Sequence, residues 1–431
     1  MIDLKTVRTD VVGSLLRPQT LKDARVAFDE GRIDGAAFRA AEDASVTAAV
    51  RLQESAGLDV ISDGEMRRLN FQDSFGAAVE GYDAKRSTLK VYERRVEGSA
   101  PLQRWDIAQM HDVGTAVSHR RPAKARLTLA RNVPLEEYQN VSQLAARPVK
   151  VSLIGPDRIT QRFDYQASSA VYRDLDDFVA DVVALERAIV ESLVKAGCRY
   201  IHIDAPGFTA YVDEPSLAQM RARGEDPQRN LQRSLKAEAA VVSDLPQSVA
   251  TGIHLCRGNQ RSMWHREGTY DAIAERLFNA LPHDRFLLEY DSPRAGSFAP
   301  LRFVPKGKVV VLGLVSTKVP ELETVDALKR RIDEAAKILP LDQLAISPQC
   351  GFASDVVGNC SARMSRSASS SAWSRRRGRC GAGSACSVQI DAGLRDGHGL
   401  YTRHGGDSLS PAGRGSRPCS RHARATIRPK L

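Results

Sequence analysis

The strongest constraint on the fold is a repeated alternation of short apolar runs with helical segments. Eight runs rich in β-branched and other apolar residues span residues 10–12, 58–61, 149–154, 200–203, 248–255, 285–288, 308–315 and 344–346. Segments with helical spacing of apolar residues cover 41–56, 175–196, 231–243, 270–281 and 321–339. Strands that alternate with helices form a parallel sheet, and eight such units close into a barrel. The sequence therefore predicts an α/β fold, a (β/α)8 TIM barrel.

The interval between the second and third runs is much longer than the others. It holds charged stretches at 85–95 and 120–126. A simple connection between a strand and a helix takes only a few residues. We therefore predict a long insertion between strands 2 and 3 that forms an extra hairpin or a lid over the rim of the barrel.

The composition changes abruptly after Asn359. Residues 361–431 hold 13 arginines and one lysine against three aspartates and no glutamate, so the positive charge of the chain lies here and the rest is nearly neutral. Such a segment cannot bury a core. We predict a catalytic barrel over 1–359 and an irregular Arg/Ser/Gly-rich tail over 360–431, either disordered or an out-of-frame translation. The alternative is a basic arm for nucleic acid or an anionic membrane surface.

Other features favour a cytoplasmic enzyme. The N-terminal residues lack the apolar core of a signal peptide, and no stretch reaches the 18 or so apolar residues of a membrane span. The barrel region holds only Cys198, Cys256 and Cys350 before the tail begins, which does not make a disulfide framework. We expect no membrane partner and, from the neutral barrel, no nucleic acid; the oligomeric state stays open.

Four residues with metal-binding side chains lie at or just past the ends of three separate apolar runs. They are His254, Cys256, Glu289 and Cys350. Each strand of a barrel delivers its C-terminal residue to the same rim, so these side chains are expected to converge. Imidazole, thiolate and carboxylate are ligands that Zn²⁺ prefers, and a tetrahedral site needs four. The set predicts a zinc site that activates a thiol, because a hydrolytic site more often lacks two thiolates.

The chain from Thr9 to Asn359 resembles the catalytic barrel of the cobalamin-independent methionine synthase family. The matching segments are Thr9-Asp10-Val11-Val12-Gly13-Ser14, Ser62-Asp63-Gly64-Glu65, Ile154-Gly155-Pro156, Ile203-Asp204-Ala205-Pro206, His254-Leu255-Cys256, Glu289 and Pro348-Gln349-Cys350-Gly351. The resemblance implies that His254, Cys256, Glu289 and Cys350 bind zinc and that Ser14, Glu65 and Asp204 bind homocysteine. It implies methyl transfer from a 5-methyltetrahydrofolate-type donor to homocysteine, giving methionine. Carboxylates at strand ends independently suit the ammonium group of an amino acid.

The sequence departs from the family pattern mainly on the donor side. Residues 313–318 contain no His to act as general acid, so no catalytic acid is assigned; the fourth-strand motif reads Asp204-Ala205-Pro206, and residues 157–163 lack a Trp to stack on a pterin. An alternative comes from single-barrel relatives, the epoxyalkane:coenzyme M transferases, which add a small thiol such as coenzyme M to an epoxide. A sulfonate or a folate glutamate could then meet positive charge from Arg67, Arg68, Arg158, Arg162 and Arg257. A further alternative is a non-catalytic zinc-binding or nucleic-acid-binding protein.

Overall fold

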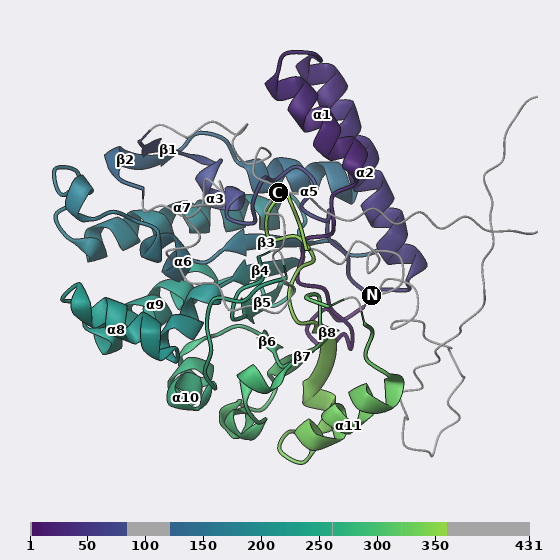
Figure 1. Cartoon of the computed structure of the whole chain (residues 1–431), viewed down its shortest axis with the longest axis vertical. Coiled ribbons are helices and arrows are strands. Elements are labelled where there is room, and N and C mark those ends of the chain that lie inside the picture. The colour runs from purple at the N-terminus through teal and green to yellow at the C-terminus, as the bar shows by residue number, and fades with distance from the viewer. Residues whose placement is uncertain (1, 84–120, 261, 320, 360–431) are drawn as a thin grey trace, which may run out of the picture. The chain divides into compact units, whose positions relative to one another are not determined.

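A parallel sheet of six strands forms the centre of the protein (Figure 1). The computed structural model describes residues 2–83, 121–260, 262–319 and 321–359. The strands are β3 (Lys150–Ile154), β4 (Tyr200–Asp204), β5 (Ala250–Leu255), β6 (Arg285–Glu289), β7 (Val309–Val315) and β8 (Leu344–Pro348). They pair in chain order, and every pair is parallel. Burial on both faces explains why these strands appear in the sequence as continuous apolar runs.

The first two predicted runs complete the ring through single bridges. Thr9 pairs with Ile346 of β8, and Ile61 pairs with Val149 immediately before β3. The two segments meet each other where the Leu15 amide donates to the Gly64 carbonyl at 3.0 Å. The predicted barrel is therefore closed, but the prediction of regular strands over 10–12 and 58–61 is wrong.

Side chains replace the missing strand ladder in these two segments. The Val11 amide donates to the carboxylate of its neighbour Asp10, and the Val12 carbonyl accepts from the Ser152 hydroxyl at 3.1 Å. In the second segment the Gln53 amide group binds both the backbone N–H and the carbonyl of Ser62, at 3.0 and 2.8 Å. Backbone groups satisfied in this way have no need of a neighbouring strand.

Helices cover the outside of the sheet (Figure 1). The five predicted ones are present with shifted ends, as α2 (Gly35–Ser55), α7 (Leu175–Lys195), α9 (Pro227–Val241), α10 (Asp271–Ala280) and α11 (Val325–Ala336). Further helices are α1 (Gln19–Asp29), α3 (Asp73–Gly76), α5 (Val133–Ser142), α6 (Pro156–Gln161) and α8 (Glu214–Ala222), with 3-10 turns η2 (Gln166–Ser168), η3 (Pro206–Tyr211), η4 (Pro293–Ala295), η5 (Ala299–Phe303) and η6 (Leu341–Gln343). Asp34, Asp174 and Thr324 cap the first turns of α2, α7 and α11. None of the described helices is long and apolar enough to cross a membrane.

The insertion before β3 contains the predicted hairpin. Strands β1 (Val79–Tyr82) and β2 (Ala123–Leu129) pair antiparallel, with α3 before them and α5 after them. The Arg121 amide, just before β2, donates to the Arg162 carbonyl at 2.8 Å, which fixes this end of the hairpin beside α6. The charged stretch 85–95 and the predicted tail 360–431 lie outside the described residues.

A buried carboxylate joins the first segment to three strands. Asp10 accepts hydrogen bonds from Lys150 Nζ at 2.8 Å, the Tyr200 hydroxyl at 2.6 Å and Arg285 Nε at 3.1 Å. These three residues are the first of β3, β4 and β6. Burial alone would raise the pKa of Asp10, but Lys150 and Arg285 outweigh burial and hold the pKa well below its usual range. Asp10 is therefore ionised, and its carboxylate joins the closing segment, to which it belongs, to these three strands.

We expect Asp10→Asn to lower the free energy of unfolding by about 3–5 kcal/mol, because it leaves two buried cations without their counter-ion. Urea unfolding at pH 7 measures this. The pKa of Asp10 is lowered on folding, so its stabilisation is present at neutral pH and is lost as the pH falls below about 4. The difference in the free energy of unfolding between the parent and the variant should therefore become smaller in acid. Asp333→Asn, on the exposed face of α11, is the control; equal losses in both variants would contradict the prediction.

Candidate metal and substrate site

Three of the four predicted zinc ligands meet at the C-terminal rim of the barrel. His254 lies in β5, Cys256 follows that strand, and Cys350 follows β8. Their donor atoms all lie within 4.8 Å of one another, and the two sulfurs are 3.9 Å apart. Two thiolates at about 2.3 Å from a tetrahedral ion would be about 3.8 Å apart. The cluster therefore has the donor chemistry and the spacing of a zinc site.

The charges of the cluster also suit a bound cation. The hydrogen bond from the Cys350 thiol lowers the pKa of Cys256 to about 7, against the effect of burial. Burial alone would lower the pKa of His254, but the Cys256 thiolate and the Asp204 carboxylate raise it to about 9. The negative groups around His254 therefore favour positive charge at the centre of the cluster, which a proton on His254 supplies. A metal ion would displace the protons of the cluster, as metal binding to thiols and imidazoles requires.

The fourth predicted ligand, Glu289, lies beside the cluster but is held by other residues. One carboxylate oxygen accepts from the Arg257 backbone amide, and the other lies 3.3 Å from Lys318 Nζ. Burial would raise the pKa of Glu289, but Lys318 and Arg257 lower it to about 2. Among the described residues the compact donor group contains His254, Cys256 and Cys350 without Glu289. The role of Glu289 as a ligand stays a prediction.

A chain of buried polar contacts orients His254 from inside the barrel. Asp204 Oδ1 lies 3.0 Å from His254 Nδ1 and 3.2 Å from His202 Nε2, and Lys150 Nζ lies 3.3 Å from His202 Nδ1. A carboxylate on one ring nitrogen fixes the orientation of a histidine whose other nitrogen binds metal. Sequence reasoning missed His202. Its signal was the period-two pattern of Tyr200, His202 and Asp204, which places all three on one face of β4.

We expect His202→Ala to weaken zinc binding by about 10–100-fold, because Asp204 loses the partner that holds it against His254. Competition with a chromogenic chelator measures the affinity. His283→Ala removes another fully buried histidine, one whose ring nitrogens have no hydrogen-bond partner in the described chain. This control should keep the parent affinity. Unchanged zinc affinity in the His202 variant would contradict the role assigned to the chain of contacts.

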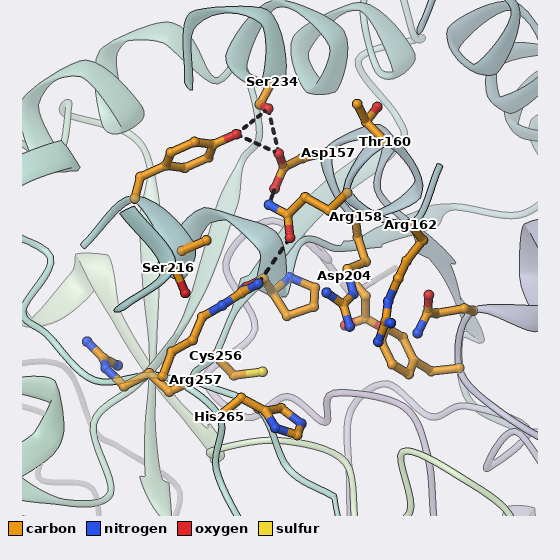
Figure 2. A pocket seen from close by; sticks show the side chains of 18 of the residues that line it. Asp157, Arg158, Thr160, Arg162, Asp204, Ser216, Ser234, Cys256, Arg257 and His265 are labelled. Atoms are coloured by element: carbon orange, nitrogen blue, oxygen red, sulfur yellow. Dashed lines mark hydrogen bonds between the residues drawn. The ribbon is translucent and has the colours of Figure 1, made fainter. Parts of the chain in front are cut away.

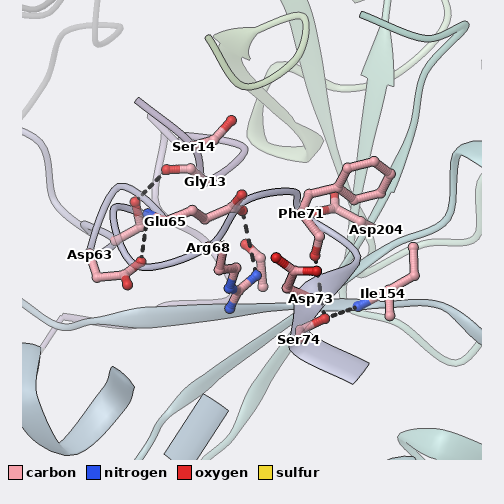
Figure 3. Close-up of polar contacts among 12 residues, drawn as sticks. Gly13, Ser14, Asp63, Glu65, Arg68, Phe71, Asp73, Ser74, Ile154 and Asp204 are labelled. Atoms are coloured by element: carbon pink, nitrogen blue, oxygen red, sulfur yellow. Dashed lines mark hydrogen bonds and ion pairs between the residues drawn. The ribbon is translucent and has the colours of Figure 1, made fainter. Parts of the chain in front are cut away.

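The three predicted homocysteine-binding residues line the same cavity as the metal cluster. Ser14, Glu65 and Asp204 share a cavity of about 980 Å³ with His254, Cys256 and Cys350. Figure 3 shows Ser14, Glu65 and Asp204 together with the residues that support them. The structure thus brings together six of the seven predicted site residues. Their roles in binding a substrate stay predictions.

Two glycines make room for the acidic end of this cavity. A Cβ on Gly13 would lie 2.7 Å from Glu65 Oε1, and a Cβ on Gly351 would lie 2.0 Å from the Ser14 hydroxyl oxygen. Glu65 itself has a positive φ of 55°, a conformation that costs free energy for a residue other than glycine. The backbone is therefore shaped to place these side chains against the cavity.

One carboxyl oxygen of Glu65 has no hydrogen-bond partner among the described residues. Its Oε2 is buried and makes no hydrogen bond within the described residues, and Oε1 lies 3.7 Å from Arg68, whose guanidinium is bound mainly to Glu137 at 2.7 Å. Burial raises the pKa of Glu65 to about 8. A buried carboxyl group of this kind is suited to receive a cation such as an ammonium group.

The arginines considered from the sequence divide into two groups. Arg67 pairs with Glu42 and Asp43, Arg68 pairs with Glu137, and Arg257 donates to the Gly268 carbonyl. These three are used within the fold. Arg257 also lines the cavity, and so do Arg158 and Arg162 (Figure 2). His265 and Arg266, which the sequence reasoning had not singled out, line it as well.

The fold and the site define a (β/α)8-barrel enzyme with a cluster of His and Cys side chains suited to a metal ion. Residues 7–366 match the family model of the cobalamin-independent synthase catalytic domain, and the chain belongs to this family. It is 34% identical to the uncharacterized Bacillus subtilis protein YxjH over 354 residues, which cover 82% of this chain and 89% of that protein. It is 27% identical to a methionine synthase of Pyrococcus abyssi, with 81% and 88% covered.

A solved structure of a B12-independent methionine synthase from Shewanella sp. W3-18-1, in complex with selenomethionine, has the same fold. The TM-score is 0.58 at 16% identity, and the match covers 84% of this chain and 96% of that one. The comparisons confirm the resemblance seen in the sequence, the barrel and the prediction of a methyltransferase-type enzyme.

Proposed function

We propose that this chain is a zinc-dependent methyltransferase that moves a methyl group from a 5-methyltetrahydrofolate-type donor to homocysteine, giving methionine. The observation that carries the proposal is one cavity that holds both the His254, Cys256 and Cys350 cluster and the acidic pair Glu65 and Asp204. A thiol that also bears an ammonium group would match both ends. Membership of the cobalamin-independent synthase family and relatives named methionine synthase support it.

Each group would have a defined part in the reaction. Zinc held by His254, Cys256 and Cys350, with Glu289 as the ligand implied by the resemblance, would lower the pKa of the acceptor thiol and keep it as a thiolate at neutral pH. Glu65 and Asp204 would bind the ammonium group, and Ser14 would contact the same amino acid. The sulfur would then form a bond to the methyl carbon as the bond from that carbon to the donor nitrogen breaks, and the nitrogen would take up one proton and leave as a neutral amine.

A second candidate is the addition of a small anionic thiol, such as coenzyme M, to an epoxide. The observation that favours it is the presence of Arg158 and Arg162 in the cavity that holds Cys256, since guanidinium groups bind sulfonates well. Methyl transfer to homocysteine would support the first candidate. Consumption of an epoxide that depends on coenzyme M would support the second.

We expect about one zinc ion per chain in the purified protein. We expect a large loss of zinc in Cys350→Ala, because the set of metal ligands then loses one of its thiolates. Elemental analysis after dialysis measures the content. Cys198→Ala is the matched control, since Cys198 is also buried but lies outside the donor group. A folded parent that cannot take up zinc would remove the basis of the proposed function.

We expect Glu65→Gln to raise the KM for homocysteine by about tenfold or more, because the ammonium group can no longer donate a charge-assisted hydrogen bond to a carboxylate at this position. Zinc content should stay at the parent level. Steady-state kinetics of the purified enzyme measure the change, with the exposed Glu275→Gln on α10 as control. Equal KM values in the parent and the Glu65 variant would show that this carboxylate does not bind the substrate.

A further inference from the structure

The wall of the cavity formed by α6 and the loop after β5 is strongly basic. Arg158 lies in α6 and Arg162 directly follows it, four residues later, so the two lie on the same side of the helix. Figure 2 shows both side chains extending in the same direction. Arg266 and His265 line the cavity from the loop after β5. Like charges at this spacing repel one another. The arrangement therefore requires an explanation.

The carboxylate nearest in sequence to this wall is already occupied. Asp157 accepts from the Tyr211 hydroxyl at 3.0 Å, the Ser234 hydroxyl at 2.5 Å and Gln161 Nε2 at 3.1 Å. Gln161 in turn accepts from Arg266 at 3.0 Å through its Oε1. This network, drawn in Figure 2, holds Arg266 in place but does not include Arg158.

Arg158 has no counter-ion among the described residues. No described group accepts a hydrogen bond from its guanidinium, and its Nε is buried without a partner. Burial lowers the pKa of Arg158, and Arg162 and Arg266 lower it further. The same two effects make an anion beside these groups favourable, because a partly desolvated guanidinium binds an oxyanion through two parallel hydrogen bonds.

We propose that Arg158, Arg162 and Arg266 form an oxyanion subsite that receives a carboxylate, sulfonate or phosphate group of a substrate whose reacting atom lies at Cys256. Glu65 and Asp204 line the same cavity, so one cavity offers both carboxylates and guanidinium groups. The carboxylates receive the ammonium group of a substrate, and the guanidinium groups receive its anionic group. The inference rests on the proposed function only in placing the reaction at Cys256.

The test is calorimetric titration of the full-length protein with sodium sulfate and with disodium glutarate, at constant ionic strength so that screening does not change. We expect saturable binding in the parent and a loss of about tenfold or more in affinity in Arg158→Gln. Arg158→Lys, which keeps the charge but not the fork, should bind with intermediate affinity. Arg51→Gln, an exposed arginine on α2, is the matched control and should bind as the parent does.

The melting temperature of Arg158→Gln without anion should equal or exceed that of the parent, since the substitution removes one of several like charges. If this variant does not fold, Arg162→Gln gives the same comparison. Absence of saturable binding in the parent, or equal affinity in the parent and the folded variants, would overturn the proposal. These results need neither zinc nor turnover, so they are independent of the zinc content and of methyl transfer, which test the proposed function.

Repeating the titration with saturating homocysteine identifies the source of the oxyanion. Binding that persists supports a subsite for the alkyl donor, such as the glutamate of a folate. Binding that homocysteine competes away supports a subsite for the acceptor thiol. Both results support the subsite itself.

Discussion

The buried Asp10 carboxylate is the interaction on which the barrel and the site both depend. It binds Lys150, Tyr200 and Arg285, the first residues of three strands, and so ties the irregular closing segment to the sheet. Lys150 then continues the contacts to His202, and through Asp204 they reach His254 at the opposite end of the strands. Ionised groups in a barrel interior are tolerated only when every member has a partner. The same network therefore closes the fold and orients a predicted metal ligand.

The cavity above this network separates charge in a way that a substrate can use. It is lined by Glu65, whose raised pKa and whose Oε2, without a hydrogen-bond partner among the described residues, mark a carboxyl group that a bound cation would stabilise. Its basic wall carries Arg158 beside other cations. The His254 and Cys256 pair lines the same cavity. Proteins accept the cost of burying such groups where a ligand supplies the missing partners.

Sequence patterns predicted the parts of the structure that depend on local periodicity. The six regular strands and the five helices follow from apolar runs and helical spacing, and the His254 and Cys256 pair follows from their place at the end of β5. The two closing segments were predicted as regular strands and are not, because the side chains of Asp10, Ser152 and Gln53 satisfy their backbone groups. Apolar periodicity does not report hydrogen bonds from side chains to backbone groups, whether the residues are neighbours, as Asp10 and Val11 are, or far apart, as Ser152 and Val12 are.

The sequence by itself determined the barrel and the chemical identity of the donor set, since strand and helix periods and residue types are local properties. Only the tertiary structure decided which charged groups face the cavity. Lys318 holds Glu289 beside the cluster. Arg68 forms an ion pair with Glu137 and is therefore not available to a substrate. Arg158 has no partner among the described residues. These outcomes depend on partners brought together by strand order and barrel closure. The free energy of a buried charge is set by those partners and not by its neighbours in the chain.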